Sequence, residues 1–334
     1  SAATWATGSG GWTIGDTETD GSFTTGASVR FHDVDGDTVP ATHTVTVAAD
    51  GVTAGDITVV AGKNSNYTLE GGAATATKLT KYGASTLTLS NANTINGDIL
   101  LNGGTLVLNN VGALGGTGKL AFGATSGQLK YGDGIAPTFE TTVDDLSTRV
   151  SGVMRLDLNG NKVTWTAQAQ NSTDWLTDVT LSNSNTDTVG ALKTSTLPSG
   201  TLTLGKGTEW VLNMSDGAFT VPAALKGEGA VRLSGGTAGL ILSSTGVPVS
   251  VEAQEEFTGK WIFDNYFEKN LDLTQLGKNA TVVFDNCSSD TDRYFASGIL
   301  TFEQNIELLN SGLTLRNGYS TAVYTFTGKW TGDG

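Results

Sequence analysis

The chain has 334 residues, of which 16% are charged, and it contains 45 glycines but only 5 prolines. Few Lys, Glu and Arg residues argue against solvated helices, and Gly, Asn and Asp between short apolar runs indicate strands joined by tight turns. Glycine shows no three-residue period, which excludes collagen, and the net charge of −14 excludes a basic surface for nucleic acid or anionic lipid.

Residues 1–75 contain bulky aromatic side chains followed by clean alternating segments. Trp5, Trp12 and Phe23 lie among Gly, Asp and Thr residues. Alternation of apolar and polar residues predicts strands at 29–31, 44–47 and 57–60. We expect residues 1–75 to form N-terminal capping coils continuous with the solenoid inferred below, because the first coil of a solenoid exposes an unpaired edge and an open core.

A turn between two of these strands has the spacing of a calcium loop. Asp33, Asp35 and Asp37 occupy alternate positions around Gly36. The bidentate Glu of a calcium loop is missing, because position 44 is Thr. We interpret the segment as a solvated hairpin turn, with calcium binding left open, and we predict no metal or cofactor site.

Only two histidines occur, His32 and His43, so any Ser-His-Asp site must use one of them. No Gly-Asp-Ser-Gly motif of serine-protease passengers is present. We interpret both histidines as exposed turn or strand residues, and we assign no catalytic residue.

From residue 76 to 334 a Gly-x-apolar-x-apolar pattern recurs and predicts short strands. Each segment places two apolar side chains on one face, with Thr, Lys or Arg on the other, after a glycine at the corner. Such strands are too short to bury a face alone and must stack. The segments are 104–108, 118–122, 152–156, 200–204, 229–233, 298–302 and 312–315.

An internal repeat supports stacked coils. Phe257-Thr258-Gly259-Lys260-Trp261 recurs as Phe326-Thr327-Gly328-Lys329-Trp330, and Gly97 in a related segment aligns with Gly259. The separation within each pair is close to a multiple of roughly 23, which suits one coil of a three-sided solenoid. We expect Trp261 and Trp330 at equivalent coil positions, forming a ladder or an exposed stripe.

Residues 79–114 resemble the passenger-associated transport repeat of bacterial autotransporters. That repeat runs Leu-x-Lys-x-Gly-x-Gly-x-Leu-x-Leu, then Ser-x-x-Asn-x-x-x-Gly, then Gly-x-Leu. The matching positions are Lys81, Gly83, Leu87, Leu89, Asn93, Gly97, Gly104 and Leu106, and Ser85 replaces the second glycine. The resemblance is good over residues 5–120, partial over 255–290 and at the C-terminal end, and faint between.

The resemblance implies an all-β fold, a right-handed parallel β-helix with an N-terminal cap. It further implies export across an outer membrane by a C-terminal translocator β-barrel outside this sequence, so we expect the chain to stop within a longer protein. In such proteins the repeat is linked to secretion and folding, and not to chemistry.

Two other features contain residue types that could form a site. Asp144-Asp145 lacks the Gly-His-Gly and Arg-x-Lys companions of β-helical glycoside hydrolases, so we interpret the pair as the start of a loop. Cys287, the only cysteine, lies at a strand end and is expected to be a half-buried structural thiol.

These observations predict a non-enzymatic structural or adhesive rod at the bacterial surface or secreted from it. Host glycans, mucin, matrix or neighbouring cells are the expected partners, without nucleic acid and without direct membrane insertion. The first alternative is a carbohydrate-active enzyme, a polysaccharide lyase or hydrolase, with its site in loops of residues 133–200. The second is a secretion and folding stalk for an effector outside this sequence. The ligand and its binding residues are not predicted.

Overall fold

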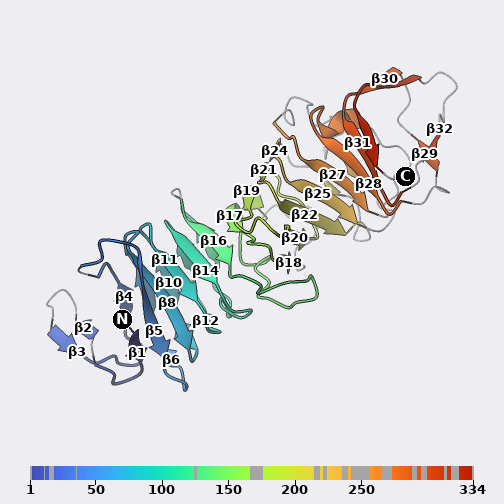
Figure 1. Cartoon of the computed structure of the whole chain (residues 1–334). Helices are drawn as coiled ribbons and strands as arrows, with labels where there is room; N and C mark the ends of the chain where they lie inside the picture. The colour runs from blue at the N-terminus through green and yellow to red at the C-terminus, as the bar shows by residue number, and fades with distance from the viewer. Residues whose placement is uncertain are drawn as a thin grey trace. The chain divides into compact units, whose positions relative to one another are not determined.

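The chain forms two compact β units, Ser1–Asn161 and Lys162–Gly334 (Figure 1). Among the described residues the only helical element is one 3-10 turn, η3 (Leu273–Leu276), and no helix there is long and apolar enough to span a membrane. The computed structural model describes residues 2–10, 12–14, 19–34, 36–123, 126–165, 176–213, 219–220, 224–234, 240–241, 256–264, 273–287, 292–294, 299–311, 314–316 and 323–332.

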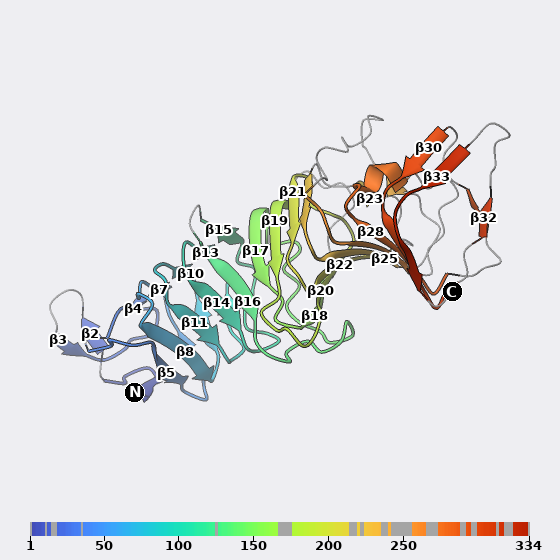
Figure 2. The same ribbon diagram turned by 45° about the horizontal axis from the view of Figure 1, so that its top comes forward.

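The first unit is a three-sided parallel solenoid, in which strands of the same side lie next to one another (Figures 1 and 2). The first side contains β1 (Ala2–Trp5), β5 (Ala41–Val47), β8 (Ser65–Gly71), β11 (Thr86–Leu89), β14 (Thr105–Leu108), β16 (Gln128–Tyr131) and β17 (Gly152–Asp157). The second contains β4 (Val29–Phe31), β7 (Asp56–Val59), β10 (Lys78–Lys81), β13 (Ile99–Leu101) and β15 (Leu120–Phe122). The third contains β6 (Val52–Thr53), β9 (Ala74–Ala76) and β12 (Thr94–Ile95). A separate antiparallel hairpin joins β2 (Trp12–Ile14) to β3 (Thr19–Gly21).

Side chains alternate in and out along each strand, and the inward ones stack from coil to coil. Leu87 pairs with Tyr67 in the coil before it and with Leu106 in the coil after it. Leu87 and Leu106 are both fully buried. Each buried leucine contributes about 2 kcal/mol of hydrophobic stabilisation, because its apolar surface is covered by the rungs above and below it. The strands predicted at 29–31, 44–47 and 57–60 and the glycine-bounded strands are confirmed, apart from residues 298 and 312–313, which lie outside the described residues.

The glycines of the transport-repeat segment lie where neighbouring backbones touch. A Cβ atom on Gly83 would lie 2.2 Å from the carbonyl oxygen of Ala61, and one on Gly97 would lie 2.1 Å from that of Thr77. Gly104 combines a φ of +63° with a contact of 2.2 Å to the Ser85 oxygen. These positions need glycine because no side chain fits between consecutive rungs.

Asn93 occupies the inside of a corner and satisfies backbone groups of three consecutive coils. Its Oδ1 accepts a hydrogen bond from the amide of Ala74 at 3.0 Å, and its Nδ2 donates to the carbonyls of Asn91 and Ala113. Asn161 repeats this arrangement, accepting from the Ala136 amide at 2.7 Å and donating to neighbouring carbonyls. Buried corners need such partners because the backbone groups there have left the strand ladder.

Lys81 is fully buried at another corner. Its Nζ donates to the carbonyls of Tyr82 at 2.7 Å and Gly83 at 3.2 Å. Burial disfavours the charged ammonium and lowers the pKa of Lys81 to about 8. The basic residue of the repeat therefore has a structural position between rungs.

The second unit is built mainly on one eight-stranded parallel sheet. Its strands are β18 (Lys162–Thr164), β20 (Gly190–Thr194), β22 (Thr208–Asn213), β25 (Ala230–Ser234), β27 (Lys260–Asp264), β28 (Thr281–Asp285), β31 (Asn305–Leu309) and β34 (Trp330–Gly332). A further side contains β19 (Leu176–Ser182), β21 (Thr201–Leu204) and β24 (Ala224–Gly227). Three parallel pairs complete the described strands, β23 (Phe219–Thr220) with β26 (Leu240–Ile241), β29 (Asp292–Tyr294) with β32 (Thr314–Arg316), and β30 (Ile299–Phe302) with β33 (Val323–Phe326).

The internal repeat that ends in Trp261 and Trp330 corresponds to three rungs of this sheet. Trp261 pairs with Val282, Val282 with Ile306, and Ile306 with Trp330. The equivalence of the two tryptophans is therefore confirmed, and so is the coil length that their separation predicts for this part of the chain. The tryptophans form no contiguous stripe, because two rungs lie between them; Trp261 is fully buried and Trp330 is 41% exposed.

The parallel solenoid is as predicted, whereas a distinct N-terminal cap stays a prediction. Trp5 and Phe23 are buried, and their rings meet edge to face at 5.4 Å. They fill the interior of coils to which β4, β5, β7 and β8 already belong.

Replacing Gly104 with alanine should destabilise the first unit more than replacing Gly134. Both glycines have a φ of +63°, so alanine brings about 1–2 kcal/mol of backbone strain at either position. Only at Gly104 does the new Cβ meet other atoms, the Ser85 oxygen at 2.2 Å and Lys81 Nζ at 2.8 Å. We expect Gly104→Ala to lower the free energy of unfolding by about 2 kcal/mol more than Gly134→Ala in urea titrations followed by circular dichroism. Equal losses would show that the rungs are not in contact at Gly104.

The free energy of unfolding should rise between pH 7.5 and 10 because of Lys81. Below pH 8 both states carry the lysine proton. Between pH 8 and 10.5 the unfolded chain keeps a proton that the folded chain has released, which favours folding as pH rises. We expect the stability difference between the native chain and Lys81→Met to change by about 2 kcal/mol in favour of the native chain over this range. Lys78→Met, which removes a half-buried lysine from the same strand, serves as the matched control. A pH-independent difference for Lys81→Met would contradict the assignment.

Candidate functional site

The first candidate group includes Asp37, the last aspartate of the segment that has the spacing of a calcium loop. Asp37 Oδ2 accepts hydrogen bonds from His43 Nε2 at 2.7 Å and from Ser65 Oγ at 2.8 Å. These two hydrogen bonds hold the pKa of Asp37 below its usual value, and the one from His43 has the larger effect. The ring of His43 also packs against Tyr67 at a centroid distance of 5.5 Å.

This group brings together Asp, His and Ser, but not in the order that activates a nucleophile. In a catalytic triad the histidine stands between the serine and the carboxylate. Here Ser65 Oγ donates to Asp37 and accepts from the Val34 amide at 3.0 Å, so its hydrogen bonds hold the turn. The expectation that His43 is exposed is wrong: it points inward from β5 and is only 8% exposed, whereas His32 is exposed as predicted.

The interpretation of the Asp33-to-Asp37 segment as a hairpin turn is wrong, because β4 and β5 lie on different sides of the solenoid and each pairs in parallel with other strands. Its described carboxylates are partly occupied by structural contacts. Asp33 Oδ1 accepts a hydrogen bond from the Gly62 amide at 2.7 Å, and Asp37 bonds to His43 and Ser65. Asp35 lies outside the described residues. Within the part of the chain that the structure describes, no group of three His, Cys, Asp or Glu residues is arranged to hold a metal ion.

A polar hollow of about 330 Å³ surrounds the Asp144-Asp145 pair in the first unit. It is lined by Gly115, Gly116, Thr117, Lys119, Asp144, Asp145, Thr148 and Arg149. The structure therefore gives the aspartate pair two cationic companions, Lys119 and Arg149, that the sequence patterns did not reveal. A linear motif could not identify Lys119, because it comes from the preceding coil.

Two of the lining residues fasten their loop to that preceding coil. Asp144 Oδ2 accepts from the Leu114 amide at 2.7 Å, and Arg149 donates to the carbonyls of Gly118, at 2.7 Å, and Leu114. Burial raises the pKa of Asp144, although the Leu114 hydrogen bond and the charge of Arg149 oppose this. Burial likewise lowers the pKa of Arg149, against the attraction of Asp144. The Asp144-Asp145 pair lies in a loop, as interpreted from the sequence, but in the middle of residues 132–151 and not at the start, and this loop lines a charged hollow.

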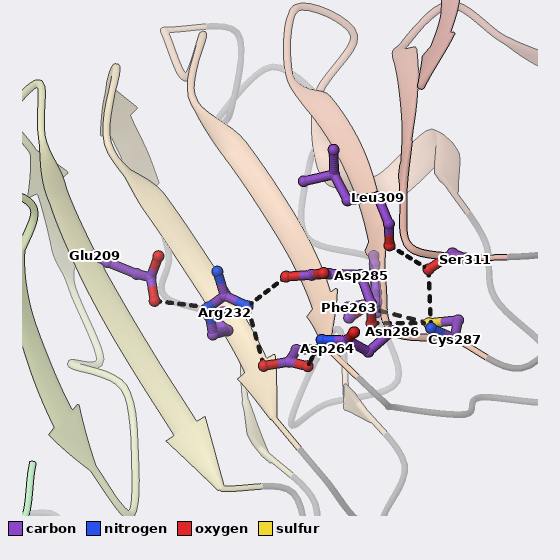
Figure 3. Close-up of polar contacts among 9 residues, drawn as sticks. All are labelled: Glu209, Arg232, Phe263, Asp264, Asp285, Asn286, Cys287, Leu309 and Ser311. Atoms are coloured by element: carbon purple, nitrogen blue, oxygen red, sulfur yellow. Dashed lines mark hydrogen bonds and ion pairs between the residues drawn. The ribbon is translucent and has the colours of Figure 1, made fainter. Parts of the chain in front are cut away.

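A second charged cluster lies on the outer face of the main sheet of the second unit (Figure 3). Arg232 on β25 bonds through Nε to Glu209 Oε1 at 2.7 Å, and through Nη1 to Asp264 Oδ2 and Asp285 Oδ2, both at 3.0 Å. Asp264 and Asp285 are direct cross-strand neighbours. Burial alone would lower the pKa of Arg232, but its bonds to Glu209 and the other carboxylates outweigh burial and raise it.

This Arg232 cluster covers an outward-facing apolar strip. Ala230, Ile262 and Val283 are at most 8% exposed and pack with Leu309 on the outer side of the sheet. Lys260 extends over the neighbouring strand β28 to bond Glu307 on β31 at 2.7 Å. Long side chains of this kind cover apolar surface with their methylene stems while their charged ends pair above it. The arrangement is structural: one cation holds three carboxylates that would otherwise repel one another.

Cys287 is more buried than the half-buried position expected from the sequence. Its side chain is 3% exposed and its Sγ lies 3.3 Å from the carbonyl oxygen of Phe263 (Figure 3). Its backbone amide donates to Ser311 Oγ at 2.9 Å. The thiol therefore lies at a strand end in a structural position, as predicted.

Comparison of the chain with models of known protein families, with curated proteins and with solved structures found no match.

Replacing Arg232 with methionine should destabilise the second unit at neutral pH. Glu209, Asp264 and Asp285 would be left with no shared cation, and removing one partner of a largely buried ion pair costs about 3 kcal/mol. Urea titrations at pH 7, followed by circular dichroism, measure this loss.

The matched control is Lys226→Met in the same unit. Lys226 pairs with Glu256, but the two side chains are 41% and 68% exposed, so its removal should cost less than about 1 kcal/mol. A loss for Arg232→Met as small as that of the control would contradict the stabilising role of the cluster.

Proposed function

We propose that the chain is a non-enzymatic, surface-exposed or secreted β-helical passenger of the bacterial autotransporter type, with a structural or adhesive role. The observation that carries the proposal is the role of the transport-repeat residues. Gly83, Gly97 and Gly104 lie at contacts between coils, and Asn93 and Lys81 satisfy buried corners. Residues with these positions support folding coil upon coil, which is the role that the resemblance implies for the repeat.

The outer surface supports an adhesive role. Thr44, Thr68 and Thr88 stand in register on β5, β8 and β11, and their side chains are on the outward side of the sheet. Parallel rungs repeat about every 4.8 Å, so such a row presents closely spaced hydroxyl groups on a rigid surface. We propose host glycans, mucin, matrix or neighbouring cells as partners of this surface, with export through a C-terminal translocator β-barrel.

The ionisable groups also favour a structural interpretation over an enzymatic one. Asp37, His43 and Arg232 direct their polar atoms to other groups of the chain itself. The alternative of a carbohydrate-active enzyme rests on one observation, the carboxylates and cations gathered around Asp144-Asp145. That hollow overlaps the start of the range 133–200 in which such a site is expected.

The two functions are separated by testing adhesion and cleavage with the same protein. Beads coated with the chain should bind mucin- or matrix-coated surfaces above beads coated with albumin. The soluble chain should release no reducing ends and no unsaturated uronic acids from a panel of plant, algal and host polysaccharides. Cleavage that is lost in an Asp144→Asn, Asp145→Asn double variant would establish the enzymatic alternative instead. Absence of both adhesion and cleavage would leave the stalk interpretation.

A further inference from the structure

The hollow around Asp144-Asp145 exists because one coil abandons the regular strand pattern. After β16 the chain returns to the sheet through residues 132–151, which pair with the preceding coil only at the bridge between Val150 and Leu120. Hydrogen bonds to the preceding coil fix the loop, among them the Asp144 amide to the Val111 oxygen at 2.9 Å, the Leu114 amide to Asp144, and Arg149 to the carbonyls of Gly118 and Leu114. These hydrogen bonds between the loop and the preceding coil keep the hollow open, so it is part of the folded first unit.

Its lining is mainly polar. Two carboxylates, two cations and two hydroxyls share the space with the bare backbone of Gly115 and Gly116, and no aromatic or aliphatic side chain lines it. Its volume of about 330 Å³ is at the small end of ligand sites, which run from about 300 to 1,000 Å³. An apolar or large ligand does not suit such a site, whereas a small molecule rich in hydroxyl groups does.

Several of its polar atoms are left without partners in the described part of the chain. Lys119 is exposed and its Nζ makes no hydrogen bond or ion pair there. Asp144 accepts the hydrogen bond of the Leu114 amide through Oδ2, so its Oδ1 atom is left to accept from a ligand. Arg149 Nη2 is buried without a hydrogen-bond partner among these residues. A buried donor without an acceptor is unfavourable, so Arg149 has an unused donor in the wall of the hollow.

We propose that this hollow binds one neutral sugar unit of a glycan. Lys119, Arg149 and Thr148 bring donors to the lining, and Asp144 and Asp145 bring acceptors, which matches the paired donor and acceptor character of sugar hydroxyls. The Thr117 hydroxyl donates to the Asn96 carbonyl at 3.3 Å, so it can only accept from a ligand. Two carboxylates offset the two cations, so the site has no excess positive charge to attract an acidic sugar. The inference rests on the proposed adhesive function and specifies its ligand class.

The test is direct binding of single sugars to the intact chain. Galactose, glucose, N-acetylglucosamine and glucuronate are titrated separately and followed by saturation-transfer NMR, with dissociation constants on the order of 1 mM expected for a neutral sugar. Lys119→Met and Asp145→Asn should each weaken that binding at least tenfold. Asp145→Asn keeps the oxygen that accepts from the Ser147 amide, so the turn itself is retained.

The matched control is Asp50→Asn, in a smaller hollow of about 220 Å³ whose lining includes several threonines. This variant should bind the neutral sugar as the native chain does, and circular dichroism should show the same fold for all three variants. Binding of glucuronate alone, of no sugar, or equally by Lys119→Met and the native chain would overturn the inference.

Failure of this inference is distinguishable from failure of the adhesive function. Bead adhesion that persists in Lys119→Met, while the native chain binds no single sugar, would overturn the hollow as the ligand site and leave the adhesive function in place. Sugar binding by a chain that shows no bead adhesion would support the hollow and count against the adhesive function.

Discussion

The stacking of parallel rungs at strand spacing is the constraint on which the rest of the structure depends. At that spacing the inward leucines of one coil cover those of the next, and at the corners neighbouring backbones touch. Gly83 and Gly97 are required there because a Cβ would lie 2.2 Å and 2.1 Å, respectively, from a carbonyl oxygen of the preceding coil. The corners also remove backbone groups from the ladder, and Asn93 and Lys81 supply their missing partners. A sequence that meets these needs at each turn specifies a solenoid without any long-range signal.

This explains why the fold was predictable from the sequence. The strands at 29–31 and 104–108 follow from two-residue alternation, and the spacing of Trp261 and Trp330 follows from coil length. Those features are local or periodic, so a single sequence shows them. The corner glycines are equally visible, because no other residue tolerates both a positive φ and direct backbone contact.

The charged sites were not predictable, because each depends on which coils become neighbours. Arg232 meets Glu209, Asp264 and Asp285 from three other strands. Coil lengths between these strands vary. Arg232 pairs with Val211 in the coil before it and with Ile262 in the coil after it, and the connection to Ile262 is the longer of the two. No fixed spacing connects such residues. The burial of His43 could not be predicted from its neighbours in the sequence either. Its place near a strand end suggested exposure, but it points inward from β5 and packs against the ring of Tyr67.

The regular coils and the charged hollow therefore lie in different parts of the chain. In the regular coils, inward polar side chains such as Asn93 and Lys81 donate to backbone carbonyls, and outward ones form simple rows such as Thr44, Thr68 and Thr88. The concave, charged surface around Asp144 lies where a coil departs from the ladder, in residues 132–151. The departure is tolerated because Asp144 and Arg149 replace the lost strand pairing with hydrogen bonds to the coil before it. A solenoid can thus acquire a binding site in one coil without disturbing its neighbours, since each rung needs only the two beside it.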